Sequence, residues 1–370
     1  MGAIKNIVIP EDATLPTGAA LTDSVKTIIN SRNEDGEKIT ARVPTSETLA
    51  DLFGDNIPDK TLSFDDFISG LHRKAISNFE DANTYLSSIG EKTVDNPSVS
   101  ALNNCNGKWT ESGYAVFVWN ALAKKNRESR LCANKGIYSV YVYVKLPNRT
   151  SADEDWTQLF VNRITSTLSN YPAAQSKRIS AISSNYGRRF ELISSNPDSV
   201  ILKFDNFTMN TVWTSMGITL FDPYTDITAI DVISASMMDS LFEKFKGKVV
   251  PSKNLQCFLS VKRSTRPDRR YQWVHEGNHV KTILQWIQVI SSTNPMMVLD
   301  ENLTYDDLNG KFFAVSLSEI SKADIEALNT GLAGSIVSPM LQPQWAVDKL
   351  FECKTFGDIE DQIYEMIAFH

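Results

Sequence analysis

The chain has 370 residues, of which 42% are hydrophobic and 22% charged, and it carries a net charge of −7 at pH 7. These proportions are typical of globular proteins and exclude disorder over the whole length, and the lack of a long apolar run excludes a membrane-spanning helix. The charge is divided unevenly, because residues 101–295 carry 24 basic and 15 acidic side chains while both flanking stretches are acidic.

The first third of the chain is predicted to be helical after an extended N-terminal arm. Prolines and a glycine discourage a helix in residues 1–21. A helix is expected to follow Thr22 or Asp23 and to end at the turn in residues 33–36. Ser63 is expected to cap a longer helix of apolar residues at helical spacing. Residues 90–113 are rich in Asn, Ser and Gly, which predicts a loop.

The rest of the chain predicts helices and three strands. Alternating tyrosines and valines make residues 137–144 the clearest strand, and shorter strands are predicted at 200–204 and 256–261. Amphipathic patterns predict helices over 156–171, 179–186, 227–245, 280–290, 321–336 and 358–369. The expected fold is mainly α with a few short strands, an α-rich α+β protein of two lobes. The lobes are predicted at 22–205 and 206–370, after the arm at 1–21.

The segment His275-Glu276-Gly277-Asn278-His279 resembles the H-E-x-x-H motif of zincin metalloproteases. On a helix, His275 and His279 would both ligate zinc, and Glu276 would act as general base on the metal-bound water. The neighbouring residues favour another interpretation. Gly277-Asn278 is a poor helical pair, and Asn278 suits the N-cap of a helix that begins at His279. Glu301, the most plausible third ligand, is predicted to lie in a loop.

Three basic clusters lie in the middle of the chain, and arginine outnumbers lysine in them, which suits bidentate binding of phosphate. Aromatic residues lie nearby, as in grooves that bind single-stranded nucleic acid. The alternative is that the basic residues are solvated and the rings belong to the core. The predicted RNA-binding residues are Lys124, Lys125, Arg127, Lys177, Arg178, Arg188, Arg189, Arg263, Arg266, Arg269, Arg270, Tyr271 and Trp273.

Other sequence patterns of catalytic sites are missing. The chain has no G-x-x-x-x-G-K-[ST] phosphate loop and no G-x-S-x-G elbow. Glu352-Cys353-Lys354 fits half of a nuclease carboxylate-x-lysine pattern, but no upstream acid on a strand is evident.

The sequence favours a non-enzymatic RNA-binding, self-assembling protein of the viral nucleocapsid or coat type. Its basic groove would package single-stranded RNA, and its N-terminal arm and C-terminal helix would bind neighbouring copies in a homo-oligomer. It would need no cofactor and would lie in the cytoplasm, or in the virion if viral, without membrane contact. The alternative is a zinc metallohydrolase with His275 and His279 as zinc ligands and Glu276 as base.

Overall fold

The computed structural model describes residues 4–6, 27–32, 38–43, 57, 59–88, 99–133, 136–147, 156–159, 197–215, 217, 222–228, 232–247, 250, 254–291, 310–328 and 345–369. The chain forms two compact units. Unit 1 comprises residues 1–117, 226–237 and 354–359, and unit 2 comprises 118–225, 238–353 and 360–370. No helix among the described residues is long and apolar enough to cross a membrane.

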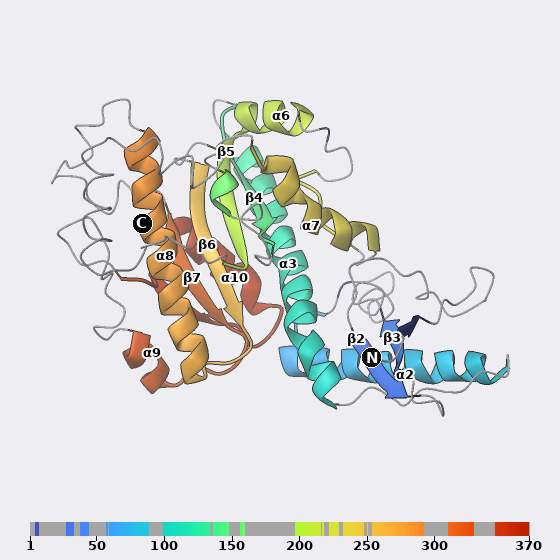
Figure 1. Ribbon diagram of the computed structural model, residues 1–370. Coiled ribbons are helices and arrows are strands. Elements are labelled where there is room, and N and C mark those ends of the chain that lie inside the picture. Colours follow the sequence, from blue (N-terminus) through green and yellow to red (C-terminus); the bar gives the residue numbers. More distant parts are fainter. Residues whose placement is uncertain are drawn as a thin grey trace, which may run out of the picture. The chain divides into compact units, whose positions relative to one another are not determined.

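Unit 2 is built on a five-stranded mixed sheet with the strand order β4-β5-β6-β7-β8 (Figure 1). Antiparallel pairs join the first three strands, and parallel pairs join β6 to β7 and β7 to β8. The strands are β4 (Ser139–Lys145), β5 (Ser199–Asp205), β6 (Leu255–Lys262), β7 (Lys311–Ser316) and β8 (Lys349–Glu352). The expectation of a mainly helical fold with a few short strands is therefore wrong.

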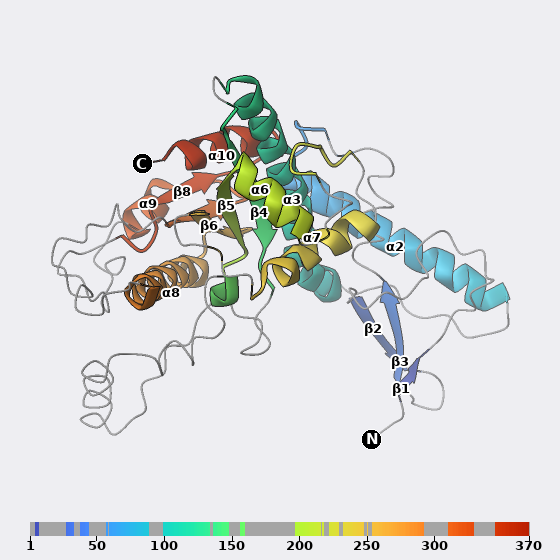
Figure 2. The same cartoon turned by 90° about the horizontal axis from the view of Figure 1, so that it is seen from above.

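The sheet of unit 2 is covered by helices on both faces. Figure 2 shows α8 (Pro267–Ser291) on one face and α10 (Asp358–Ala368) on the other. The predicted C-terminal helix is thus confirmed, and its residues Ile363 and Met366 are buried within its own chain. Further along the chain are α6 (Asn206–Ser215), α7 (Val232–Phe245), α9 (Lys322–Leu328) and the 3-10 turn η2 (Trp156–Leu159).

Unit 1 holds a small sheet of order β1-β3-β2, made of β1 (Ile4–Asn6), β2 (Thr27–Arg32) and β3 (Lys38–Val43). β2 and β3 pair antiparallel, with Thr27 opposite Val43 and Arg32 opposite Lys38. The helix predicted after Thr22 is therefore wrong over 27–32, where β-branched residues form a strand instead. Of the arm predicted at residues 1–21, residues 4–6 form β1, and the rest lie outside the described part of the chain.

Helix α2 (Phe64–Ser88) begins at the predicted cap, because Ser63 Oγ accepts a hydrogen bond from the Asp66 amide at 3.1 Å. Helix α3 (Val99–Leu131) shows that the loop predicted at 90–113 is wrong over residues 99–113, and residues 90–98 lie outside the described part of the chain. Its Gly113 lies so close to Phe67 that an added Cβ would stand 2.9 Å from the ring. The glycine that indicated a loop serves close packing inside a helix.

Candidate active site

Two neighbouring strands of unit 2 bring a carboxylate and a lysine together. Asp198 directly precedes β5, and Lys262 is the last residue of the adjacent strand β6. The Val261 amide donates a hydrogen bond to Asp198 Oδ2 at 2.5 Å, which holds the carboxylate against the end of β6. Lys262 Nζ lies 3.1 Å from the same oxygen, so the two side chains form an ion pair. The side chains of Lys262 and Asp198 are 12% and 17% exposed, and both remain accessible from solvent.

A second carboxylate reaches the same lysine from α8. Glu276 Oε1 lies 4.0 Å from Lys262 Nζ, and the Glu276 side chain is only 2% exposed. Ser260 lies two residues before Lys262 on β6, so both project from the same face of the strand. The Ser260 hydroxyl donates a hydrogen bond of 2.6 Å to Glu276 Oε2. The site thus gathers Asp198, Ser260, Lys262 and Glu276.

Burial raises the pKa of Glu276 above its usual value, although the positive charge of Lys262 acts in the opposite direction. Gln272 donates a hydrogen bond of 2.8 Å to Oε1, so both oxygens of Glu276 have a donor. Hydrogen bonds of this kind fix the orientation of a carboxylate that has few contacts with water.

Helix α8 brings Glu276 to the sheet by running through the whole histidine motif. The prediction of a helix that begins at His279 is wrong, because α8 begins at Pro267. Gly277 is the reason that α8 packs so closely: an added Cβ there would lie 2.0 Å from the Ala346 carbonyl oxygen. Trp273, which is fully buried, anchors the helix by donating from Nε1 to the Ser260 carbonyl at 3.2 Å.

The two histidines of the motif lie on the same helix, with ring centroids 4.0 Å apart, and His275 is exposed. Glu276 instead faces Ser260 and Lys262 on β6. Within the described ranges, no group of three or more His, Cys, Asp and Glu side chains is arranged to hold a metal ion. Glu301, the expected third ligand, lies outside these ranges.

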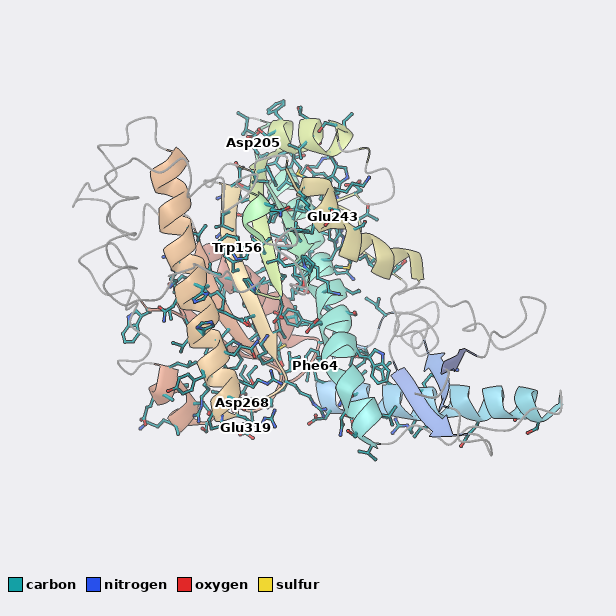
Figure 3. All side chains as sticks on the ribbon, in the orientation of Figure 1. Phe64, Trp156, Asp205, Glu243, Asp268 and Glu319 are labelled. Atoms are coloured by element: carbon teal, nitrogen blue, oxygen red, sulfur yellow. The ribbon has the colours of Figure 1, made fainter. Side chains whose placement is uncertain are left out.

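Several of the predicted basic residues lie at the start of α8, the helix that carries Glu276. Figure 3 labels Asp268 at the N-terminal end of the helix. Arg266 and Arg269 both approach the Asp268 carboxylate, at 3.6 and 3.7 Å, and remain 65% and 41% exposed. Arg270 instead pairs with Asp324 of α9 at 2.8 Å. Tyr271 is 65% exposed, whereas Trp273 belongs to the core.

The other predicted basic clusters do not lie at the site. Lys124 on α3 pairs with Glu360, Lys125 Nζ lies over the Tyr364 ring, and Arg127 donates to the Tyr224 carbonyl at 2.6 Å. These contacts are all made within unit 2. Lys177, Arg178, Arg188 and Arg189 lie outside the described residues.

Residues 27–368 match the family described as Cfr10I/Bse634I restriction endonuclease. The chain belongs to this family. It is 24% identical over 348 residues to the type II restriction enzyme Cfr10I of Citrobacter freundii, which covers 92% of this chain and 99% of that protein.

Two solved structures of the family share the fold. A crystal structure of the type IIF restriction endonuclease Bse634I with cognate DNA aligns with a TM-score of 0.62 and 22% identity, covering 94% of this chain and 99% of that one. A second Bse634I structure gives a TM-score of 0.63 and 22% identity, covering 93% and 98%.

Membership of the family corrects the functions predicted from the sequence. The chain is neither a nucleocapsid or coat protein nor a zinc metallohydrolase, because the family is one of restriction endonucleases. The prediction of a non-enzymatic protein is wrong for the same reason. Single-stranded RNA is the wrong partner, since the Bse634I structure contains cognate DNA. Virion location has no support once the coat function is removed.

Sequence reasoning found one of the four site residues for the wrong reason and overlooked the other three. Glu276 was assigned to a zinc motif, and Lys262 directly precedes the predicted basic residue Arg263 without being predicted itself. Asp198 and Ser260 were not singled out. The available signal was Ser260 and Lys262 at and just after the end of one predicted strand, with Asp198 two residues before another predicted strand. Asp198 and Lys262 lie more than 60 residues apart in the sequence, and the pairing of β5 with β6 brings them together.

Proposed function

We propose that this chain is an endonuclease that hydrolyses phosphodiester bonds of double-stranded DNA at a specific sequence, with a divalent metal ion. The observation that carries the proposal is the meeting of Asp198 and Glu276 at the Lys262 ammonium, in a chain of the restriction endonuclease family. We place the activity in the cytoplasm, where the DNA of a cell and of its invaders can be cut.

The two carboxylates suit a hard divalent cation. Mg²⁺ is bound in proteins by one or two carboxylates, with water and substrate phosphate completing its oxygen ligands. Asp198 and Glu276 already share a cation, because the Lys262 ammonium lies within 4.0 Å of both. They would hold the metal, which supplies charge stabilisation of the phosphate and a more acidic bound water.

The protein groups have separate roles in this proposal. Lys262 provides a positive charge for the phosphate oxygens, on which negative charge develops during phosphoryl transfer. Ser260 holds Glu276 in place through its hydroxyl. Asp198 is fixed by the Val261 amide, so its position does not depend on the lysine alone.

The exposed start of α8 is proposed to bind DNA. Arg269 lies on the same helix as Glu276, and Arg266 directly precedes that helix. Both side chains keep much of their surface in solvent. Guanidinium groups bind phosphates and guanine edges through paired donors, and a helix N-terminus favours anions. Tyr271 adds an exposed ring beside them.

The test is cleavage of DNA by the purified full chain. Genomic and plasmid DNA of varied sequence, incubated with Mg²⁺, should give discrete fragments, and chelation with EDTA should abolish them. Lys262→Met and Asp198→Asn should lower the cleavage rate by at least about 100-fold, the usual cost of losing a charged group that stabilises the transition state.

Lys311→Met is the matched control, because Lys311 begins β7 at the end of the β6–β7 pair opposite to Lys262. It should cleave at the parent rate. The proposal fails if no DNA is cut with any divalent metal, or if Lys262→Met retains the parent rate.

A further inference from the structure

A chain of two hydrogen bonds along α8 links an exposed arginine to the buried carboxylate of the site. Arg269 Nη1 donates to Gln272 Oε1 at 3.0 Å. Gln272 Nε2 donates to Glu276 Oε1 at 2.8 Å. The three residues follow one another at spacings of three and four, so they share one side of the helix.

The orientation of the Gln272 amide is set by its two partners. An arginine can only donate and an ionised glutamate can only accept, so the amide oxygen must face Arg269 and the NH₂ group must face Glu276. A flipped amide would place two donors together at one end and two acceptors at the other. Gln272 suits this position because its amide accepts a hydrogen bond from Arg269 and donates one to Glu276.

The two ends of the chain differ in their exposure. The Arg269 side chain is 41% exposed, and its ion-pair partner among the described residues is the Asp268 carboxylate at 3.7 Å. Glu276 is 2% exposed, and its second oxygen is held by Ser260. A change in the position of Arg269 on binding DNA can therefore alter the orientation of the buried Glu276 carboxylate through the Gln272 side chain alone.

We propose that Gln272 is a positioning residue that couples Arg269 to Glu276. This inference rests on the proposed function, since it concerns the carboxylate that would hold the metal. Gln272 fixes the direction of Glu276 Oε1, and Arg269 fixes Gln272. The arginine thus contributes to metal binding as well as to DNA binding, whereas Gln272 contributes to metal binding alone.

The test compares Gln272→Met, Arg269→Met and the double variant of the full chain. Methionine matches glutamine in length and replaces the aliphatic part of arginine, and it removes the hydrogen bonds of both side chains. Mn²⁺ is the probe, and its binding without DNA is followed by loss of the electron paramagnetic resonance signal of the free ion. DNA affinity is measured separately in EDTA. Thermal melting shows that each variant is folded.

Gln272→Met should weaken Mn²⁺ binding about 10-fold, a usual effect of removing a hydrogen bond to a metal ligand. Its DNA affinity in EDTA should equal that of the parent. Arg269→Met should weaken both. The double variant should bind Mn²⁺ no more weakly than Gln272→Met, because Arg269 acts on Glu276 through Gln272. His275→Gln, an exposed change beside Glu276, is the matched control and should leave Mn²⁺ binding unchanged.

Two results would overturn the coupling while leaving the proposed function intact. One is parent-like Mn²⁺ binding by Gln272→Met in a parent chain that cleaves DNA. The other is an Arg269→Met effect on Mn²⁺ binding that persists in full when Gln272 is already replaced. A parent chain that neither binds Mn²⁺ nor cleaves DNA would instead contradict the proposed function.

Discussion

Gly277 shows how one residue decides the placement of the site. A Cβ at this position would lie 2.0 Å from the Ala346 carbonyl oxygen and 2.7 Å from its carbon, and both are backbone atoms that cannot turn aside. The helix carries Glu276 one residue earlier, so a glycine that is unfavourable in an isolated helix allows the carboxylate to reach β6.

We therefore expect Gly277→Ala to destabilise the protein by about 1–3 kcal/mol, the usual cost of overpacking a core. Gly107→Ala on α3 is the control, because nothing lies within 4 Å of its added Cβ. That change should stabilise the protein by up to about 1 kcal/mol, since alanine is the better helix former. Denaturant unfolding of both variants measures the difference, and equal effects would contradict the packing explanation.

Ser260 on β6 supports the buried carboxylate of Glu276. Its hydroxyl is the donor to Glu276 Oε2, and the carboxylate is buried. Ser260→Ala should leave that oxygen without this donor and lower stability by about 1–3 kcal/mol, as expected for a charged group that loses a hydrogen bond. Ser318→Ala, a change of the same size in a nearby loop, should lower the stability of the protein by less than Ser260→Ala does. Thermal melting at neutral pH distinguishes the two.

At the scale of elements, the pair Lys281–Asp348 ties α8 to the parallel part of the sheet. Lys281 Nζ lies 2.9 Å from Asp348 Oδ2 and also donates to the Trp345 carbonyl. The same carboxylate oxygen accepts from the Phe312 amide of β7 at 2.6 Å. Both side chains are buried, at 2% and 7% exposure.

Removing one partner should leave a buried charge without its counter-ion. Lys281→Met should therefore destabilise the protein by about 3–5 kcal/mol, and adding Asp348→Asn should recover part of the loss. Chemical unfolding of the single and double variants measures this. A double variant that is less stable than Lys281→Met would contradict the role of the pair.

The same lysine predicts a pH dependence. Burial lowers the pKa of Lys281 from 10.5 to about 8, and the nearby Asp348 only partly opposes this shift. Between these two values the folded chain binds fewer protons than the unfolded chain, so the contribution of Lys281 to stability rises with pH and is lost as the pH falls through 8. The free energy of unfolding should therefore rise less with pH in Lys281→Met than in the parent across this window.

Elements with a clear local pattern could be predicted, and elements that depend on packing could not. The alternating residues of β4 and the amphipathic face of α10 are properties of the segments themselves. β7 contains a short apolar run without alternation, as expected for a strand buried between two layers, and this pattern does not distinguish strand from helix. Gly113 and Gly277 both lie inside helices, because each allows close packing against a distant segment.

At the scale of the whole molecule, an acidic chain has to bind a polyanion. The net charge of −7 opposes DNA binding, but residues 101–295 carry a balance of +9, from 24 basic and 15 acidic side chains. Some of these basic residues are paired with acidic side chains in the structure, and others are largely exposed. Lys124 is paired with Glu360, whereas Arg266 lies 3.6 Å from the exposed Asp268 carboxylate and is itself 65% exposed. Charge counted along the sequence does not reveal this difference.

The dependence of DNA affinity on salt tests that division. Each phosphate contact releases counterions, so the slope of log affinity against log salt should fall by about 0.9 when one contact is lost. Arg266→Ala should show this change if Arg266 contacts a phosphate, and a smaller slope change with relaxed sequence preference if it contacts a base edge. Lys124→Ala removes the same charge from a residue that Glu360 already neutralises, so its slope should match the parent. Equal slope changes in the two variants would mean that DNA affinity depends on the total charge of the chain and not on a contact at the start of α8.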